Sequence, residues 1–546
     1  MTGRPADATV TGVAAGDDGP GLRHPERPAM KNRPTFTLPG GRVWRRPSWA
    51  HAALWPGLPA FLLPLAVYLL TLAPTVYNLD SAELTTAAST GGLVRATGYP
   101  LYLSIGYFWS KLPLGDVGYR MNLLSAVCGA GTIAVAERIL RRWGVGTAAA
   151  FGALGLLATS PAFWGLSLVA EVYTLHTLIM AGLFLALLRW ADAPEDRLRA
   201  GTVGLLLGLG VAHHAAVVLL LPAAALYVLL AAPRALLRPR TLVAGAVGLA
   251  IGLLPFLYLP LRHAAVPAFN YAGVYDGTGR FIAADLRSVA GIWWLVSGKA
   301  FAGQMLAYTP LELRAEWRRL ALLLSQSFFA IGILPGLIGM VMLLWRRRPA
   351  GVLLLAAGAA SAMFFVDYRA VDKETMFLPV YLVWALCLGV GYQWLLDWLG
   401  QTPSRGRQSR GAGRVMRALI VGLALAAVAW NWRLADLSQD RSARDMGEAV
   451  LAAAAPGALV LGWWDTVPVV EYLQLVEGRR PDVQAINRFL LPAPALAELI
   501  RQQIRRRPVY IDSIPPELQG ELRGRPAGPL LRLSPRSAGR AEPTRP

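Results

Sequence analysis

The sequence contains little cysteine and little charge. Only two of its 546 residues are cysteines, Cys128 and Cys387, and both lie inside apolar runs. A disulfide framework or a zinc site built on cysteine needs several cysteines at suitable spacings, so the sequence argues against both. Charged residues make up 16% of the chain and hydrophobic residues 55%, which exceeds what a soluble core requires. We therefore predict an integral membrane protein.

Acidic residues are scarcer than basic ones, and the formal net charge is +20. A protein that binds nucleic acid gathers its basic residues on one soluble face. Here they form short clusters between apolar runs, such as Arg138-Ile-Leu-Arg-Arg142 and Arg346-Arg-Arg348. This distribution is typical of cytoplasmic loops, and we expect no nucleic-acid partner.

The N-terminal segment lacks a long apolar run. Residues 1–50 are rich in Pro, Gly, Arg and Asp, which predicts a disordered cytoplasmic tail. The first apolar run begins near Trp55 and is typical of an uncleaved signal-anchor. The following apolar runs predict about eleven transmembrane helices, at 55–73, 119–140, 145–163, 171–190, 201–213, 214–232, 241–261, 321–345, 350–367, 376–398 and 414–432.

The basic clusters orient these helices in the cytoplasmic (inner) membrane. When they are placed on the cytoplasmic side, the N-terminus is cytoplasmic and the outer loops are 74–118 and 262–319. Residues 98–113 are then expected to form an interfacial helix. The transmembrane domain spans 51–432.

The chain changes character after Trp432. Alternating strand and helix patterns in 433–531 predict a small extracytoplasmic α/β domain with a parallel sheet. The expected strands are 458–462, 482–486 and 508–512, with helices at 466–477 and 494–506 between them. Residues 532–546 are rich in Pro and Arg, and we expect them to be disordered. The fold class is thus an all-α polytopic membrane protein with a small C-terminal α/β domain.

Two carboxylates follow the first apolar run, in Asp80-Ser-Ala-Glu83. Asp is a favoured N-cap, and Glu three positions later completes a capping box, so the pair has a purely structural interpretation. Residues three apart also share a helix face. Carboxylates at a membrane boundary lie in reduced dielectric, where they can accept a proton. A divalent metal held by the pair is a minor alternative.

Several motifs around this pair occur together in one order. The sequence resembles a bacterial multi-pass family that is related to the eukaryotic protein O-mannosyltransferases of the GT-C glycosyltransferase class. The motifs that carry this resemblance are Ala73-Pro-Thr-Val-Tyr-Asn-Leu-Asp-Ser-Ala-Glu83, Thr97-Gly-Tyr-Pro-Leu-Tyr102, Arg120-Met-Asn-Leu-Leu-Ser125, Ala170-Glu-Val-Tyr-Thr-Leu175, Leu259-Pro-Leu-Arg262, Pro267-Ala-Phe-Asn270, Phe377-Leu-Pro-Val-Tyr381 and Gly478-Arg-Arg-Pro-Asp-Val483.

The resemblance implies a GT-C fold, a polyprenyl-phosphate sugar as donor and a first-loop carboxylate as general base. In this sequence the candidate bases are Asp80 and Glu83. The chain departs from the family pattern at Ala82, where Gly is common, and at Arg95, where a His-Pro-Pro-Gly-Tyr-Pro motif would begin. The departure at Arg95 puts in doubt any role assigned to that histidine.

The same motifs supply candidate substrate-binding residues, which are Tyr99, Tyr102, Arg120, Asn122, Glu171, Tyr173, His213, His214 and Arg262. Arginine suits the lipid phosphate because it can make bidentate contacts, but Arg120 and Arg262 could equally anchor the chain at headgroups. Glu171 could instead stabilise a helix N-terminus. His213 and His214 would point about 100° apart on a helix, which disfavours a shared zinc ion.

The sequence thus predicts a glycosyltransferase that moves a sugar, with mannose as one candidate, from a polyprenyl-phosphate donor to an exported protein or glycan. Protein Ser/Thr is the favoured acceptor, and no cofactor is firmly implied. The alternative is a polytopic transporter or lipid flippase, because polar residues in many-helix proteins often mark a translocation path. The polar residues gather at one face here, which favours the enzyme.

Overall fold

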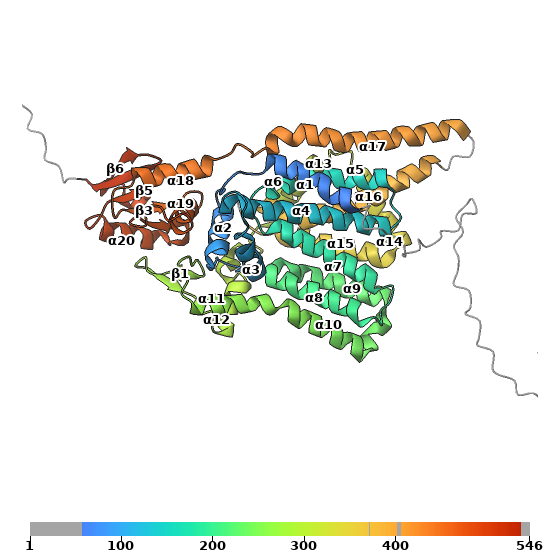
Figure 1. Ribbon diagram of the computed structural model, residues 1–546, viewed down its shortest axis with the longest axis horizontal. Helices are drawn as coiled ribbons and strands as arrows, with labels where there is room; N and C mark the ends of the chain where they lie inside the picture. The colour runs from blue at the N-terminus through green and yellow to red at the C-terminus, as the bar shows by residue number, and fades with distance from the viewer. Residues whose placement is uncertain (1–56, 371, 401–405, 537–546) are drawn as a thin grey trace, which may run out of the picture. The chain divides into compact units, whose positions relative to one another are not determined.

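The computed structural model describes residues 57–370, 372–400 and 406–536, with side chains from residue 411 onward in the last range. The tail predicted for residues 1–50 therefore lies outside the described residues, as does the end of the chain from residue 537. Figure 1 shows long helices that run alongside one another, with the short helices α2 and α3 at one end of this array.

Each predicted apolar run contains one helix of this array. Their bounds are α1 Gly57–Thr71, α4 Val117–Arg142, α5 Thr147–Ala158, α7 Tyr173–Trp190, α8 Arg197–His213, α9 Leu221–Ala231, α10 Pro239–Gly252, α14 Ile333–Arg346, α15 Arg348–Val366, α16 Leu378–Gly400 and α17 Gly406–Ala435. Among the described residues, six helices are long and apolar enough to cross a membrane and four more are shorter and apolar. The chain is a multi-pass membrane protein.

The predicted run 321–345 is not one continuous helix. α13 Pro310–Ser327 ends within this run, and α14 begins at Ile333. Between them, Phe329 and Ala330 adopt positive φ angles of 54° and 50°, which a right-handed helix cannot accommodate. Hydropathy averaged over the run did not show this break, although the polar Ser325-Gln326-Ser327 directly precedes it.

Small residues let α8 and α10 approach closely. A Cβ atom built on Gly248 would lie 2.0 Å from the carbonyl oxygen of Gly201, and one on Gly204 would lie 1.9 Å from that of Gly245. Helices in membranes commonly associate by close backbone approach at small residues. The hydrophobic effect contributes little to this association, because lipid tails are as apolar as the side chains.

The segment predicted as the first outer loop, 74–118, includes two short helices. It contains α2 Asp80–Thr90 and α3 Pro100–Trp109, and α3 confirms the short helix expected within 98–113. The segment around the second predicted outer loop, 262–319, comprises α11 Tyr258–Ala264, the antiparallel strands β1 Gly273–Tyr275 and β2 Phe281–Ala283, and then α12 Val289–Val296 and α13 Pro310–Ser327.

The C-terminal region forms a sheet of order β4-β3-β5-β7-β6. The central β3 Leu459–Gly462 pairs in parallel with β4 Gln484–Asn487 and with β5 Val509–Ile511. These are the three predicted strands, and α19 Val467–Leu475 and α20 Ala493–Gln503 are the two predicted helices. α18 Ser442–Ala453 and α19 pack on one face of the sheet and α20 on the other.

A strand over Leu530–Pro535 corrects the prediction of disorder for residues 532–535. β6 Leu522–Ala527 and β7 Leu530–Pro535 form an antiparallel hairpin, and β7 also pairs with β5. Buried Leu530 and Leu533 lie three residues apart in β7, and the residues of β6 other than Leu522 are exposed or half-buried. The hairpin therefore lacks the strict alternation by which strands are recognised in a sequence.

Candidate active site

The acidic pair lies at the start of α2, but it does not form a capping box. α2 begins at Asp80, and its N-cap is Leu79, which has a positive φ of 55° and makes no side-chain cap. Glu83 is buried at 2% exposure, whereas the side chain of Asp80 is 27% exposed. Both carboxylates instead point to Arg95, which rules out the structural interpretation based on capping.

Arg95 binds both carboxylates. Its backbone N–H donates to Oε1 of Glu83 at 3.1 Å, and its Nε donates to Oε2 at 3.2 Å. Its Nη2 donates to Oδ1 of Asp80. Burial raises the pKa of Glu83 to about 7, although the charge of Arg95 opposes this shift. One guanidinium thus balances two carboxylates, and Glu83 can take up a proton near neutral pH.

A residue of the C-terminal domain also reaches this cluster. Trp464, just after β3, donates from Nε1 to Oδ1 of Asp80 at 2.8 Å. Its ring covers the guanidinium of Arg95, with Cζ 4.1 Å from the ring centroid. Arg95 and Trp464 are not among the site residues that the sequence predicts. The unusual residue at position 95 of the family motif was the one signal that could have identified Arg95.

Arg262 binds the C-terminal end of α2. Its Nε donates to the carbonyl of Gly91 at 2.5 Å and its Nη2 to that of Thr90 at 3.4 Å. The next residues are fixed by the second outer loop, because Leu93 N–H donates to the carbonyl of Phe269 and Tyr271 N–H donates to that of Leu93. Arg262 therefore orders the acidic helix, and its contact with a lipid phosphate remains a prediction.

Arg120 and Asn122 organise the first outer loop and are not brought against the carboxylates. Arg120 donates to three carbonyls, those of Ser110, Leu114 and Gly115. Buried Asn122 donates from Nδ2 to the carbonyls of Ala73 and Thr75, both at 2.9 Å. Binding of substrate by either residue stays a prediction.

The remaining predicted residues form an aromatic and histidine cluster. The ring of His214 lies 5.4 Å from that of Tyr99 and 6.2 Å from that of Tyr173, and the ring of His213 lies 6.4 Å from that of Tyr102. Both histidines join one cluster because α8 ends at His213 and His214 is extended, so the helical angle of about 100° expected between them does not apply.

His176 also belongs to this cluster, although it is not among the predicted site residues. Its ring lies 5.5 Å from that of His214 and 6.3 Å from that of His213. His176 lies within the run 171–190, which is predicted as a transmembrane helix. Within the described parts of the chain, no group of three His, Cys, Asp or Glu is placed to hold a metal ion.

Several polar atoms of this cluster are buried without a hydrogen-bond partner among the described residues. They are Tyr102 Oη, Glu171 Oε2, Thr174 Oγ1, His176 Nδ1 and His213 Nδ1. Glu171 lies two residues before the start of α7 at Tyr173. Because an unpaired buried polar atom costs free energy, the cluster is suited to a ligand that supplies hydrogen-bonding groups. The cavity beside Tyr173, His176 and His214 has a volume of only about 10 Å³, so a ligand larger than a water molecule would require these side chains to move.

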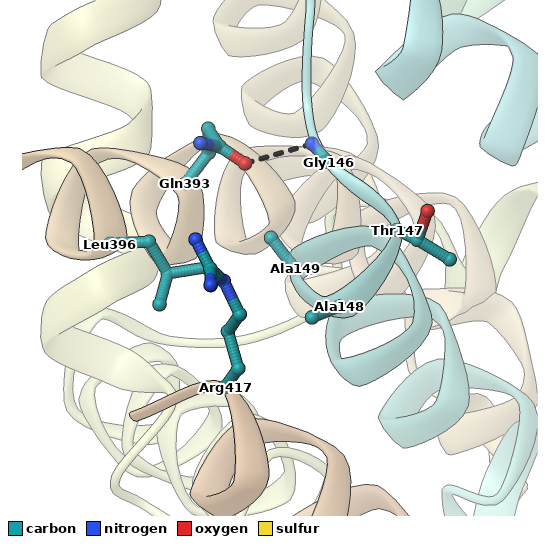
Figure 2. A pocket seen from close by; sticks show the side chains of 7 residues that line it. All are labelled: Gly146, Thr147, Ala148, Ala149, Gln393, Leu396 and Arg417. Atoms are coloured by element: carbon teal, nitrogen blue, oxygen red, sulfur yellow. Dashed lines mark hydrogen bonds between the residues drawn. The ribbon is translucent and has the colours of Figure 1, made fainter. Parts of the chain in front are cut away.

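A separate cavity of about 360 Å³ lies between α5, α16 and α17. Figure 2 shows Arg417 and Gln393 pointing into the same space, with Gln393 Oε1 accepting from the N–H of Gly146 at 2.8 Å. Its lining contains none of the predicted site residues, so it is not part of the candidate active site.

The site region matches a known protein family. Residues 80–236 match the family model of the protein O-mannosyl-transferase TMEM260 N-terminal domain. The chain is 30% identical to the mouse protein O-mannosyl-transferase TMEM260 over 225 residues, which are 39% of this chain and 31% of the mouse protein. It is 22% identical to the Dictyostelium discoideum protein O-mannosyl-transferase tmem260 over 470 residues, which are 77% of this chain and 55% of that protein. The chain thus spans less than two thirds of either relative.

The fold matches solved structures. ArnT from Cupriavidus metallidurans, in a crystal structure bound to undecaprenyl phosphate, has a TM-score of 0.55 at 13% identity and covers 87% of this chain and 97% of its own. The Archaeoglobus fulgidus oligosaccharyltransferase has a TM-score of 0.51 at 13% identity, covering 85% of this chain and 70% of its own. The fold is therefore GT-C-like, as the sequence predicts.

Proposed function

Because the chain is related to the eukaryotic protein O-mannosyl-transferases and has a GT-C-like fold, we propose that it is an integral-membrane glycosyltransferase. It moves a sugar from a polyprenyl-phosphate donor to an extracytoplasmic acceptor, with mannose as the favoured sugar and protein Ser/Thr as the favoured acceptor. Support comes from the family match over residues 80–236, which contains the carboxylate pair, Arg95 and the histidine cluster.

The observation that carries this proposal is the carboxylate pair on α2. Transfer requires a base that takes the proton of the acceptor hydroxyl while its oxygen bonds to the anomeric carbon and the bond to the lipid phosphate breaks. Asp80 is the accessible carboxylate and is suited to meet the hydroxyl. Glu83 is buried against Arg95 and holds this arrangement in place.

The donor is proposed to approach from the membrane toward the aromatic and histidine cluster. Undecaprenyl phosphate in the ArnT structure supports a lipid of this class. Tyr99 joins the two parts of the site, because it follows Arg95 by four residues and its ring lies beside His214. The proposed orientation places this region on the extracytoplasmic face, with the basic loops opposite.

The test is transfer of radiolabelled mannose from polyprenyl-phosphate mannose to protein in membranes that contain the wild type or a variant at equal expression. Asp80→Asn should reduce transfer by at least about a hundredfold, because general base catalysis contributes on that order. Glu83→Gln should reduce it less, since the amide keeps one acceptor for Arg95.

Asp285→Asn is the matched control, because this carboxylate lies in the second outer loop and is 67% exposed. It should transfer at the wild-type rate. Normal transfer by folded Asp80→Asn and Glu83→Gln would remove the catalytic role of the pair, and absence of transfer by the wild type would favour the transporter or flippase alternative.

A further inference from the structure

The C-terminal domain contributes a side chain to the carboxylate site. Trp464 and Asp80 are 384 residues apart in the sequence, and the indole N–H of Trp464 donates to Asp80 Oδ1 at 2.8 Å. The domain packs on this part of the chain through α19, which contacts α2. We propose that Trp464 is a positioning residue for sugar transfer, which fixes the orientation of Asp80. The proposal rests on the function proposed above.

Neighbouring rings hold the indole in one place. Trp464 is only 6% exposed, and its ring centroid lies 5.2 Å from that of Phe489 and 5.8 Å from that of Tyr271. Tyr271 in turn donates from its hydroxyl to Oε2 of Glu471 on α19. The second outer loop and the C-terminal domain therefore enclose the indole from different sides, which limits the directions in which its N–H can point.

The two carboxylate oxygens of Asp80 differ in the hydrogen bonds that they accept. Arg95 and Trp464 both donate to Oδ1, and the structure shows no hydrogen bond from another described residue to Oδ2. Two donors on one oxygen fix the plane of the carboxylate and leave Oδ2 to accept the proton of the acceptor hydroxyl. The ring of Trp464 also covers Arg95, so the same side chain steadies both partners.

The experiment measures kcat and KM for donor and acceptor in Trp464→Phe. Phenylalanine keeps an aromatic face near Arg95 but lacks the N–H donor. Loss of a hydrogen bond to a charged group corresponds to roughly a tenfold change or more, so kcat should fall about tenfold while both KM values stay within about twofold. A residue needed only for packing would instead lower the amount of folded protein.

Trp463→Phe is the matched control, because Trp463 is adjacent, 44% exposed and packed against Phe489. It should keep the wild-type kcat. If Trp464→Phe matched this control while the wild type transferred sugar, the positioning role would be wrong and the proposed function would stand. If the wild type transferred no sugar, both would be wrong.

A second measurement covers the case in which Trp464→Phe folds poorly. Thermal unfolding of Trp464→Phe, Asp80→Asn and the double variant gives the coupling between the two positions. The expected result is a double variant that is less destabilised than the sum of the single changes. Additive effects would show that the indole and the carboxylate do not interact, which would overturn the proposal.

Discussion

At the scale of single residues, the acidic pair depends on one cation. Arg95 is the guanidinium that binds both Asp80 and Glu83, and Glu83 is almost fully buried. Removing one partner of a buried ion pair typically costs about 3 kcal/mol or more. We expect Arg95→Gln to lower the free energy of unfolding by about that amount and to abolish transfer. Thermal unfolding in detergent and the transfer assay measure the two effects.

The control for this prediction is Arg501→Gln, which breaks the exposed ion pair with Glu521 and should cost less than about 1 kcal/mol. The loss in Arg95→Gln should also shrink at acidic pH, because protonation of Glu83 relieves the repulsion left behind. If Arg95→Gln and Arg501→Gln lowered the free energy of unfolding equally, the prediction that the acidic pair depends on Arg95 would be wrong.

The sequence predicted the acidic pair but not its partners. Asp80 and Glu83 lie three residues apart, so the short motif Asp80-Ser-Ala-Glu83 contains both. Arg95 and Trp464 lie 15 and 384 residues from Asp80, so their contacts depend on how the loop turns and on where the C-terminal domain packs. Neither is encoded in a local pattern.

At the scale of elements, the contact between α8 and α10 depends on glycine. A Cβ atom on Gly248 would lie 2.0 Å from the carbonyl oxygen of Gly201, so the two backbones would have to separate. We expect Gly248→Ala to destabilise the protein by about 1–3 kcal/mol, as overpacking usually does. Thermal unfolding in detergent measures this change.

Gly422 on α17 is the matched control, because a Cβ atom there would meet nothing within 4 Å. Alanine is the better helix former, so Gly422→Ala should be neutral or slightly stabilising. If both variants unfolded at the wild-type temperature, the close approach of α8 and α10 would not contribute to stability. Hydropathy predicted both helices, but it carries no information about which helices touch.

At the scale of the whole molecule, the sequence predicted the two parts of the chain better than their connection. Long apolar runs gave the membrane helices, and alternation of strands and helices gave the C-terminal parallel sheet. The link between them consists of side chains far apart in sequence, such as Tyr271 in the outer loop and Glu471 on α19. Such contacts follow from tertiary packing, which no periodicity encodes.

This link predicts how stability depends on pH. Burial raises the pKa of Glu471 from 4.5 to about 8, while the hydrogen bond from Tyr271 opposes the shift. Between these two values the folded protein keeps a proton that the unfolded chain releases, so this group lowers stability as pH rises from about 4.5 to about 8.

Glu471→Gln keeps an acceptor for Tyr271 and cannot ionise. The variant should therefore unfold a few degrees higher than the wild type at pH 9, and the difference should vanish near pH 5. The negative charge of Glu83 also raises the pKa of Glu471. Thermal unfolding from pH 5 to pH 9 measures the difference, and parallel curves for the two proteins would show that Glu471 is not held protonated between the domains.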